Sequence, residues 1–176
     1  MAGCEPNPGS GRYLLKLGGA GKIIVLEISA QRSKIAQELG ADAILNPVAE
    51  GLELASKIAD LTAGIGADIL YECAGVPEAL TDSINLIRSG GQVIVIGITE
   101  KDTPINPLTF VVKEVEMRGC IGYSAAEFQM AIDYLEKEKI NTDLMISETI
   151  RLDAIEEKGF KRLVSFTDAV KILIKP

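Results

Sequence analysis

The chain has 176 residues, of which 47% are apolar and 24% charged, an ordinary composition for one soluble domain with a buried core. Its formal net charge of −7 leaves no basic surface for a phosphate backbone, so we expect no nucleic-acid partner. No apolar run approaches the roughly 20 residues of a membrane-spanning helix, and residues 1–11 lack the pattern of a targeting signal. These limits predict a cytoplasmic protein that does not bind membranes.

The side chain that most often binds zinc or transfers protons is missing. The sequence contains no histidine, the commonest zinc ligand and general base. Its three cysteines, Cys4, Cys73 and Cys120, are far apart and odd in number. They suggest neither a disulfide framework nor a metal site.

Residues 1–11 are rich in proline and glycine and are expected to form a turn-rich or disordered leader without a strand. One domain then covers residues 12–176. It opens with a short apolar piece at residues 13–17, which could be the end of a helix closed by the glycines that follow.

An acidic residue between a buried strand and a helix is the most informative local feature. Residues 23–26 form an apolar run typical of a parallel strand, and Glu27 follows it. Ser29 is a candidate cap for a helix over residues 31–39. In nucleotide-binding sheets an acid at this position accepts hydrogen bonds from the adenosine ribose and disfavours a 2′-phosphate. Glu27 is therefore a candidate selector of NAD, although a surface loop can also carry a glutamate that has no such role.

Strands and helices continue to alternate. A helix is predicted within residues 48–62, a strand at residues 67–75, a helix from residue 77 that stops at Gly90-Gly91, and a strand at residues 92–98. Continuous apolar strands between helices predict an α/β fold. We expect a Rossmann-like, doubly wound and mostly parallel sheet with helices on both faces.

The second half is less regular. A capping box is predicted at Ser124 and Glu127, which would begin a further helix. Asp153 is a candidate cap for a later helix. The other predicted elements are a short helix near residues 108–114 and strands at residues 115–122, 145–150 and 169–174.

Four segments in order carry a family resemblance: KIIVLEISAQRSKIAQELGADAILNP, GADILYECAGVPEAL, SGGQVIVIGI and VKEVEMRGCIGYS. Together they resemble the cofactor-binding half of the zinc-dependent medium-chain alcohol and polyol dehydrogenases, near the threonine and sorbitol dehydrogenases. The resemblance implies an NAD site in which Glu27 binds the adenosine ribose and Arg32 lies beside the adenine. It further assigns Cys73, Ala74, Gly75 and Val76 to the nicotinamide-ribose side, and Gly97 and Ile98 to the nicotinamide.

Two parts of the family pattern have no clear counterpart. The nearest match to its glycine-rich phosphate motif is at residues 9–14, with leucine in place of the third glycine and no predicted strand before it, so a chance match is favoured. The catalytic domain with its Cys, His and Glu zinc ligands is also absent from the sequence. We therefore expect a fold that is incomplete at its first β-α unit, weak or lost NAD binding, and no zinc in this chain.

No catalytic residue is assigned. Glu72 could act as a general base, but its position at a strand end favours a structural or cofactor-shell role. Cys73 and Cys120 stand in apolar strand contexts, which favour small core residues over nucleophiles.

Three functions remain open at this point. The favoured one is a truncated NAD(H)-binding domain that is inactive alone; the others are a homodimeric scaffold without ligand and an S-adenosylmethionine-binding domain. In the usual strand order the first strand lies between the strand at residues 22–26 and the strand at residues 67–73. Without that first strand, the two strands would either pair directly with each other or leave a gap that a second copy of the chain fills. In the dehydrogenase family that the chain resembles, two subunits commonly associate through the strand that matches Val115–Gly122. A homodimer through that strand is therefore expected. A separate chain could supply the catalytic half.

Overall fold

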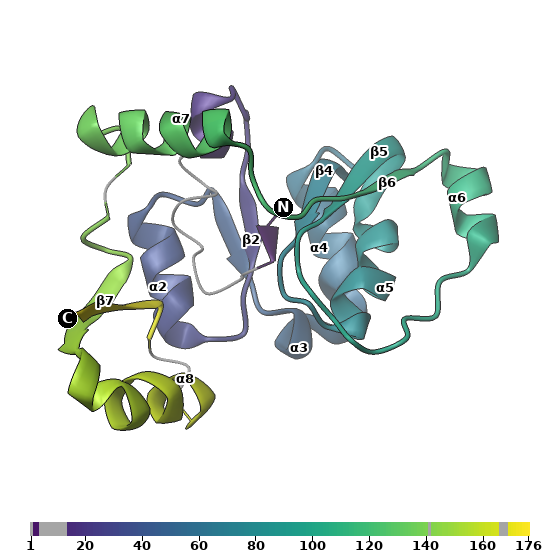
Figure 1. Ribbon diagram of the computed structural model, residues 1–176. Coiled ribbons are helices and arrows are strands. Elements are labelled where there is room, and N and C mark those ends of the chain that lie inside the picture. The colour runs from purple at the N-terminus through teal and green to yellow at the C-terminus, as the bar shows by residue number, and fades with distance from the viewer. Residues whose placement is uncertain (1, 4–13, 141, 166–168) are drawn as a thin grey trace. The chain divides into compact units, whose positions relative to one another are not determined.

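The computed structural model describes residues 2–3, 14–140, 142–165 and 169–176 (Figure 1). The chain divides into two compact units, each of which is described by itself. Of the described residues, the first unit contains residues 2–3, Ile24–Leu26 and Leu45–Gly122, and the second contains the others.

The first unit is built on parallel strands. They are β1 (Ala2–Gly3), β2 (Ile24–Leu26), β4 (Ala67–Glu72), β5 (Ile87–Val95) and β6 (Glu116–Gly119). Together with β3 (Ala43–Leu45), whose last residue belongs to this unit, they follow the order β3-β2-β1-β4-β5-β6. This is the order of a doubly wound nucleotide-binding sheet, in which ligands bind beyond the carboxyl ends of the strands where the order reverses.

Strand β1 contradicts our expectation that residues 1–11 form no strand. Ala2 pairs with Val25 of β2 and with Tyr71 of β4, so that β1 lies between these strands. The expected gap at the centre of the sheet is therefore filled within the chain, and neither direct pairing of β2 with β4 nor a second copy is needed there. Flanking strands can impose an extended backbone on residues with little strand propensity of their own. The rest of the predicted leader, and all of the candidate glycine-rich motif except Leu14, lie outside the described residues.

Helix α5 (Pro77–Leu86) ends earlier than predicted. It does not continue to Gly90-Gly91, because the chain joins the sheet at Ile87, which is buried and pairs with Ala67. Residues 88–91 then bulge out before the regular ladder with β4 resumes. Gly90 has a φ of +65°, a conformation that glycine adopts without strain.

The predicted helix within residues 48–62 is divided. It forms α3 (Pro47–Glu50), a 3-10 turn (Gly51–Glu53) and α4 (Leu54–Leu61), because Gly51 takes a positive φ of 51°. Helices α4 and α5 lie beside each other, and α5 packs against β4 and β5 (Figure 1). Apolar side chains buried in this unit are Ile24, Val25, Leu54, Ile58, Ala67, Leu70, Ile84, Leu86, Ile87, Val93 and Val115.

At the far edge of the sheet, α6 (Pro107–Lys113) precedes β6. The Asn106 side chain accepts a hydrogen bond from the Leu108 N–H, and Pro107 occupies the first helical turn, two common features of a helix start. Glu114 ends α6 in a left-handed conformation, and the buried Val115 leads into β6.

The second unit contains α2 (Ala30–Glu38), α7 (Ala125–Glu136) and a separate parallel pair of strands, β7 (Ile146–Arg151) and β8 (Lys171–Lys175). Residues 14–17 are helical, as predicted. Ile35 and Leu39 pack with Val170 and the partly buried Leu144 to form a core.

The helix caps of this unit are mostly as predicted. Ser29 begins α2, and Ser124 and Glu127 form the full capping box of α7, in which the Ser124 N–H bond lowers the pKa of Glu127. Asp153 does not cap a helix, contrary to prediction. It lies in a 3-10 turn (Leu152–Ala154) and pairs with Arg151 instead.

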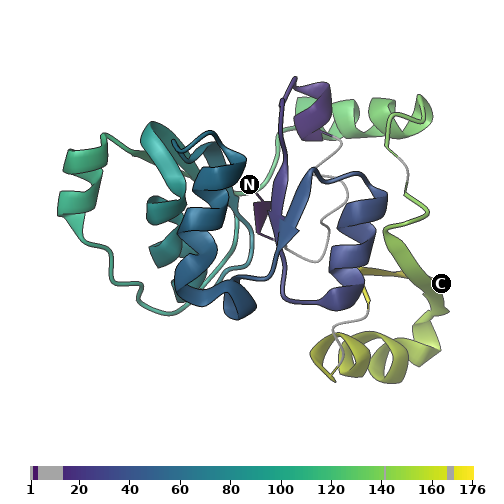
Figure 2. The same cartoon turned by 180° about the vertical axis from the view of Figure 1, so that it is seen from behind.

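Helical structure follows β7 and can be seen from behind in Figure 2. A π-helical segment (Ile155–Phe160) continues into α8 (Lys161–Ser165). Glu148 of β7 ties this segment to the strand, since it pairs with Arg162 at 2.7 Å and with Lys158 at 3.6 Å.

Candidate functional site

Glu27 stands directly after β2, where the sequence places the candidate ribose-binding acid. The residue is only 4% exposed, so its charge must be satisfied by neighbouring groups. The Ser29 N–H donates to Oε1 at 2.8 Å, and the Arg32 guanidinium donates to both oxygens, from Nη2 to Oε1 at 2.8 Å and from Nε to Oε2 at 3.0 Å. The carboxylate is therefore held in one orientation by a two-pronged ion pair.

Arg32 lies in the first turn of α2, whose start is fixed by Ser29. The Ser29 side chain accepts a hydrogen bond from the Arg32 N–H at 3.4 Å. A cation in the first helical turn is disfavoured by the helix dipole, and this turn contains no acidic residue. The ion pair with Glu27 offsets that cost and leaves the Arg32 side chain 18% exposed. The sequence predicted both residues as part of the site but not the bond between them.

In the first unit, Glu72 organises the end of β4. The residue is 3% exposed, and its Oε1 accepts hydrogen bonds from the N–H groups of Ala74 and Gly75, both at 2.8 Å. Its backbone oxygen accepts from the N–H groups of Ile96 and Gly97 at 2.8 and 2.9 Å. Glu72 thus bonds local amides, the structural role that its strand-end position favoured, and it connects the ends of β4 and β5.

The loops after β4 and β5 meet so closely that two positions admit only glycine. A Cβ on Gly97 would lie 2.6 Å from Glu72 Oε2, and a Cβ on Gly75 would lie 2.6 Å from the carbonyl oxygen of Ile98. Gly75 also has a φ of +64°. Backbone atoms therefore form much of this edge of the sheet, where a ligand can approach the main chain closely.

The structure brings together some of the predicted site residues. Glu27 bonds Arg32 in the second unit, and Gly75 meets Gly97 and Ile98 in the first. Cys73, Ala74 and Val76 belong to the same first-unit loop as Gly75.

The two described cysteines differ in burial. Cys73 is half-buried, whereas Cys120 is exposed, so the prediction that Cys120 is a core residue is wrong. Cys120 follows β6, and β6 stands at the end of the strand order, where side chains gain cover from one neighbouring strand rather than two.

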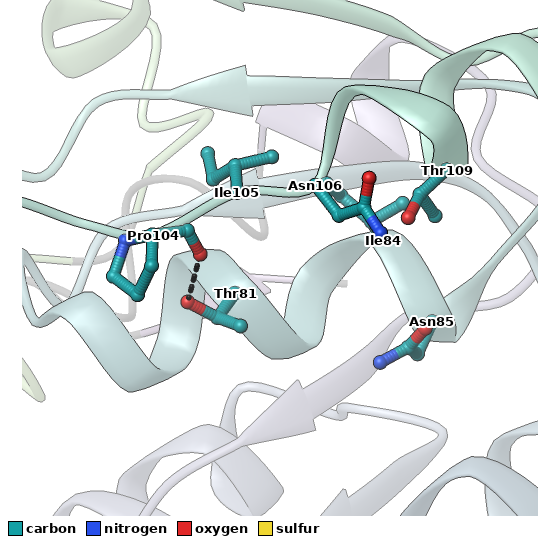
Figure 3. Close-up of a pocket in the computed structure, with 7 residues that line it drawn as sticks. All are labelled: Thr81, Ile84, Asn85, Pro104, Ile105, Asn106 and Thr109. Atoms are coloured by element: carbon teal, nitrogen blue, oxygen red, sulfur yellow. Dashed lines mark hydrogen bonds between the residues drawn. The ribbon is translucent and has the colours of Figure 1, made fainter.

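The first unit also contains a pocket of about 460 Å³ that the sequence did not predict (Figure 3). Its lining comes from α5, the segment before α6 and α6 itself: Thr81, Ile84, Asn85, Pro104, Ile105, Asn106 and Thr109. The Thr81 hydroxyl donates to the Pro104 carbonyl at 3.4 Å across one side of it. These side chains are neutral, and no motif in the sequence marks them as a group.

Lys113 of α6 supports the end of α5. Its Nζ donates to the carbonyl oxygens of Ile84 and Ile87 at 2.8 and 2.9 Å, and partial burial lowers the pKa of this ammonium group. A cation at the carboxyl end of a helix is favoured by the dipole.

The described residues contain neither a metal-binding cluster nor a membrane-spanning helix. No three His, Cys, Asp or Glu residues there are grouped so that they could hold a metal ion. None of the helices in the described part of the chain has the length and apolarity needed to cross a membrane.

Comparison with known proteins places this geometry in a family. Residues 12–137, more than half of the chain, match the family model for zinc-binding dehydrogenases. The chain belongs to this family. The resemblance to the cofactor-binding portion of zinc-type alcohol dehydrogenases, expected from four sequence segments, is thereby confirmed.

Among curated zinc-binding dehydrogenases, the chain is 33% identical over 162 residues to (R,R)-butanediol dehydrogenase of Bacillus subtilis, covering 92% of this chain and 46% of that protein. It is 29% identical over 167 residues to L-threonine 3-dehydrogenase of Caldanaerobacter subterraneus, covering 93% and 47%. The chain therefore spans about half the length of these relatives.

Solved structures of the family confirm the Rossmann-like α/β fold. The crystal structure of 2R,3R-butanediol dehydrogenase from Bacillus subtilis matches with a TM-score of 0.88 and 32% identity, over 99% of this chain and 50% of that one. A structure from Sinorhizobium meliloti, described as bound to NADP, matches with a TM-score of 0.84 and 27% identity, over 99% and 51%.

Proposed function

We propose that this chain is the NAD(H)-binding domain of a zinc-type alcohol or polyol dehydrogenase acting in the cytoplasm. The observation that carries the proposal is the buried carboxylate of Glu27 immediately after β2. It is an acceptor-only group in the position where doubly wound sheets bind the adenosine ribose.

The carboxylate acceptor at this position fits a ribose with two free hydroxyl groups. Both hydroxyls can donate to the Glu27 carboxylate once Arg32 moves aside from it, and the guanidinium then lies near the adenine, as the family resemblance implies. When bound, the nicotinamide accepts or donates a hydride. The family resemblance assigns the nicotinamide-ribose side to Cys73, Ala74, Gly75 and Val76, and the nicotinamide itself to Gly97 and Ile98.

We further propose that the affinity of the chain alone is weak. The nearest phosphate motif, at residues 9–14, has leucine where the third glycine stands in the family pattern. Each charge-assisted hydrogen bond missing from a pyrophosphate site costs about 1.5–3 kcal/mol, which moves affinity towards the millimolar range.

Other ligands remain alternatives with less support. S-adenosylmethionine also presents a ribose to an acid after the second strand, but membership of the dehydrogenase family favours a nicotinamide dinucleotide. NADP is the second cofactor to test, because one related structure is described as bound to it. A scaffold without ligand would bind none of these molecules.

A titration of the isolated chain with ADP-ribose and NADH, followed by NMR or calorimetry, tests the ribose contact. We expect weak saturable binding, and we expect Glu27→Gln to reduce it by about ten-fold because an amide accepts these hydrogen bonds less strongly than a carboxylate.

Glu38→Gln is the matched control, since it changes the net charge equally at the other end of α2 and should leave binding unchanged. No saturable binding by the wild type would reject the proposed function. Equal binding by wild type and Glu27→Gln would reject the assigned role of Glu27.

We also propose that the chain forms a homodimer through β6. Two features support the proposal: β6 stands at the end of the strand order, and the stretches of chain directly before and after it carry exposed apolar side chains. These are Leu108, Val111 and Val112 of α6 and Ile121 after β6, each at least 62% exposed.

A further inference from the structure

We propose that Glu72 is a positioning residue that holds the loops after β4 and β5 ready for the nicotinamide half of the dinucleotide, and that the adenosine half binds independently of it. The inference rests on the proposed function and adds the residue that prepares one half of the site. It starts from the hydrogen bonds that converge on Glu72 at the end of β4.

Glu72 bonds both loops at once. Its side-chain Oε1 accepts from the N–H groups of Ala74 and Gly75, both at 2.8 Å. Its backbone oxygen accepts from the N–H groups of Ile96 and Gly97, at 2.8 and 2.9 Å. One residue therefore holds four N–H groups of the two loops, so the loops cannot shift independently of each other.

The two loops are also in close contact beside the Glu72 carboxylate. A Cβ on Gly97 would lie 2.3 Å from the backbone nitrogen of Gly75 and 2.6 Å from Glu72 Oε2. Both loops follow neighbouring parallel strands, at the edge where doubly wound sheets bind ligands. A ligand that contacts both loops therefore meets a surface whose spacing is set by Glu72.

Stability alone does not explain a carboxylate at this position. Glu72 is 3% exposed, and no donor in the described part of the chain bonds its Oε2. Burying a charged oxygen without a donor lowers the free energy of unfolding. A charged acceptor does, however, hold N–H groups more strongly than a neutral one. The charge of Glu72 therefore fixes the loop after β4 at a cost to the stability of the fold.

The adenosine half of the site depends on other groups. Its proposed acceptor, Glu27, belongs to the second unit, whereas Glu72 and both loops belong to the first. Glu27 is held by the Ser29 N–H and by the Arg32 guanidinium. A change at Glu72 should therefore alter the nicotinamide half and leave the adenosine contact in place.

The test compares NADH, which reaches both halves of the site, with ADP, which lacks the nicotinamide and its ribose. Their dissociation constants are measured by NMR titration for the wild type and Glu72→Gln. We expect the wild type to bind NADH more tightly than ADP. Glu72→Gln should weaken NADH binding by about ten-fold, because a neutral oxygen holds the two N–H groups less strongly, and should leave ADP binding unchanged.

Two further variants separate positioning from a general loss of structure. Glu72→Asp keeps the charge, and because an aspartate can accept from the N–H group two residues further on, it should recover most of the NADH affinity. Glu53→Gln makes the same change in net charge at an exposed side chain of the 3-10 turn and should match the wild type. Urea denaturation of each variant reports the stability of the fold separately.

A measurement on the wild type serves if Glu72→Gln does not fold. The amide resonances of the four groups bonded to Glu72 should shift together when NADH is added and should not shift with ADP. If saturating NADH leaves these resonances unchanged, the proposed role of Glu72 is overturned.

The outcomes separate the two proposals. If the wild type binds neither NADH nor ADP, the proposed function fails and this inference fails with it. If the wild type binds both, the role of Glu72 alone is rejected by any of three results. These are no preference of the wild type for NADH, an equal effect of Glu72→Gln on both ligands, and no recovery of NADH affinity in Glu72→Asp.

Discussion

At the scale of single residues, the candidate site depends on two carboxylates used in different ways. Glu27 is held by an arginine and remains chemically suited to a ligand hydroxyl, whereas Glu72 is committed to backbone amides of its own loop. An apolar strand followed by an acid predicted Glu27. The bond to Arg32 was not predictable, because it lies five positions after Glu27 and their contact depends on the exact path of the loop between β2 and α2.

The contact between Glu72 and Gly97 gives the first prediction at this scale. Gly97→Ala would place a methyl group 2.6 Å from Glu72 Oε2, and the backbone of Gly75 gives it no room to move aside. We expect the free energy of unfolding to fall by about 1–3 kcal/mol, the usual cost of overpacking. Urea denaturation measures the change.

Gly21→Ala is the matched control, since a Cβ there meets nothing within 4 Å and the backbone needs no positive φ. If both alanine variants unfold at the same urea concentration as the wild type, the close contact between the loops after β4 and β5 is wrong.

At the scale of elements, apolar runs predicted β2, β4, β5 and β6 because strands covered on both faces need continuous apolar sequence. The ends of helices and strands were less predictable. At Ile87, where α5 gives way to β5, an apolar residue is compatible with both a helix and a strand. β1 could not be predicted, since two small residues in a segment rich in proline and glycine obtain their conformation from the neighbouring strands.

The outer edge of β6 gives a prediction about assembly. Cys120 donates its N–H to Val95 of β5, and because donors alternate along a strand, the Met117 N–H points to the other side. In the proposed homodimer, Met117→Pro removes a backbone hydrogen-bond donor from the interface between the two β6 strands. The substitution should therefore convert the dimer into a folded monomer. Light scattering over a dilution series measures the mass.

Arg118→Pro is the contrasting variant, since it removes a donor that faces β5 and should destabilise the fold itself. A wild-type protein that is monomeric at every concentration contradicts the homodimer. A dimer that survives Met117→Pro places the interface elsewhere.

At the scale of the whole molecule, the chain matches about half the length of its relatives. We expect the isolated chain to bind no stoichiometric zinc and to reduce no NAD with butanediol, threonine or sorbitol. The physical reason is that the sequence has no histidine and has only three widely spaced cysteines, so the usual zinc ligands and proton-transfer groups are missing.

Elemental analysis and NADH absorbance check this expectation directly. One zinc ion per chain, or measurable turnover with any of these alcohols, would show that other side chains replace the expected ligands. The fold class and the family were predictable at this scale because several segments occur together in a fixed order, although no single segment decides the assignment.

The central position of β1 has a consequence for the order in which the sheet assembles. Ala2 must find Val25 and Tyr71, partners that lie 23 and 69 positions further along the chain. Closing a long loop lowers the entropy of the chain before the contact that stabilises the loop has formed. Contacts between residues far apart in the sequence therefore tend to form slowly. The ladders from β4 to β6 can form without β1, but β2 is joined to β4 only through it. The middle of the sheet is therefore expected to be completed last during folding and to open first during unfolding.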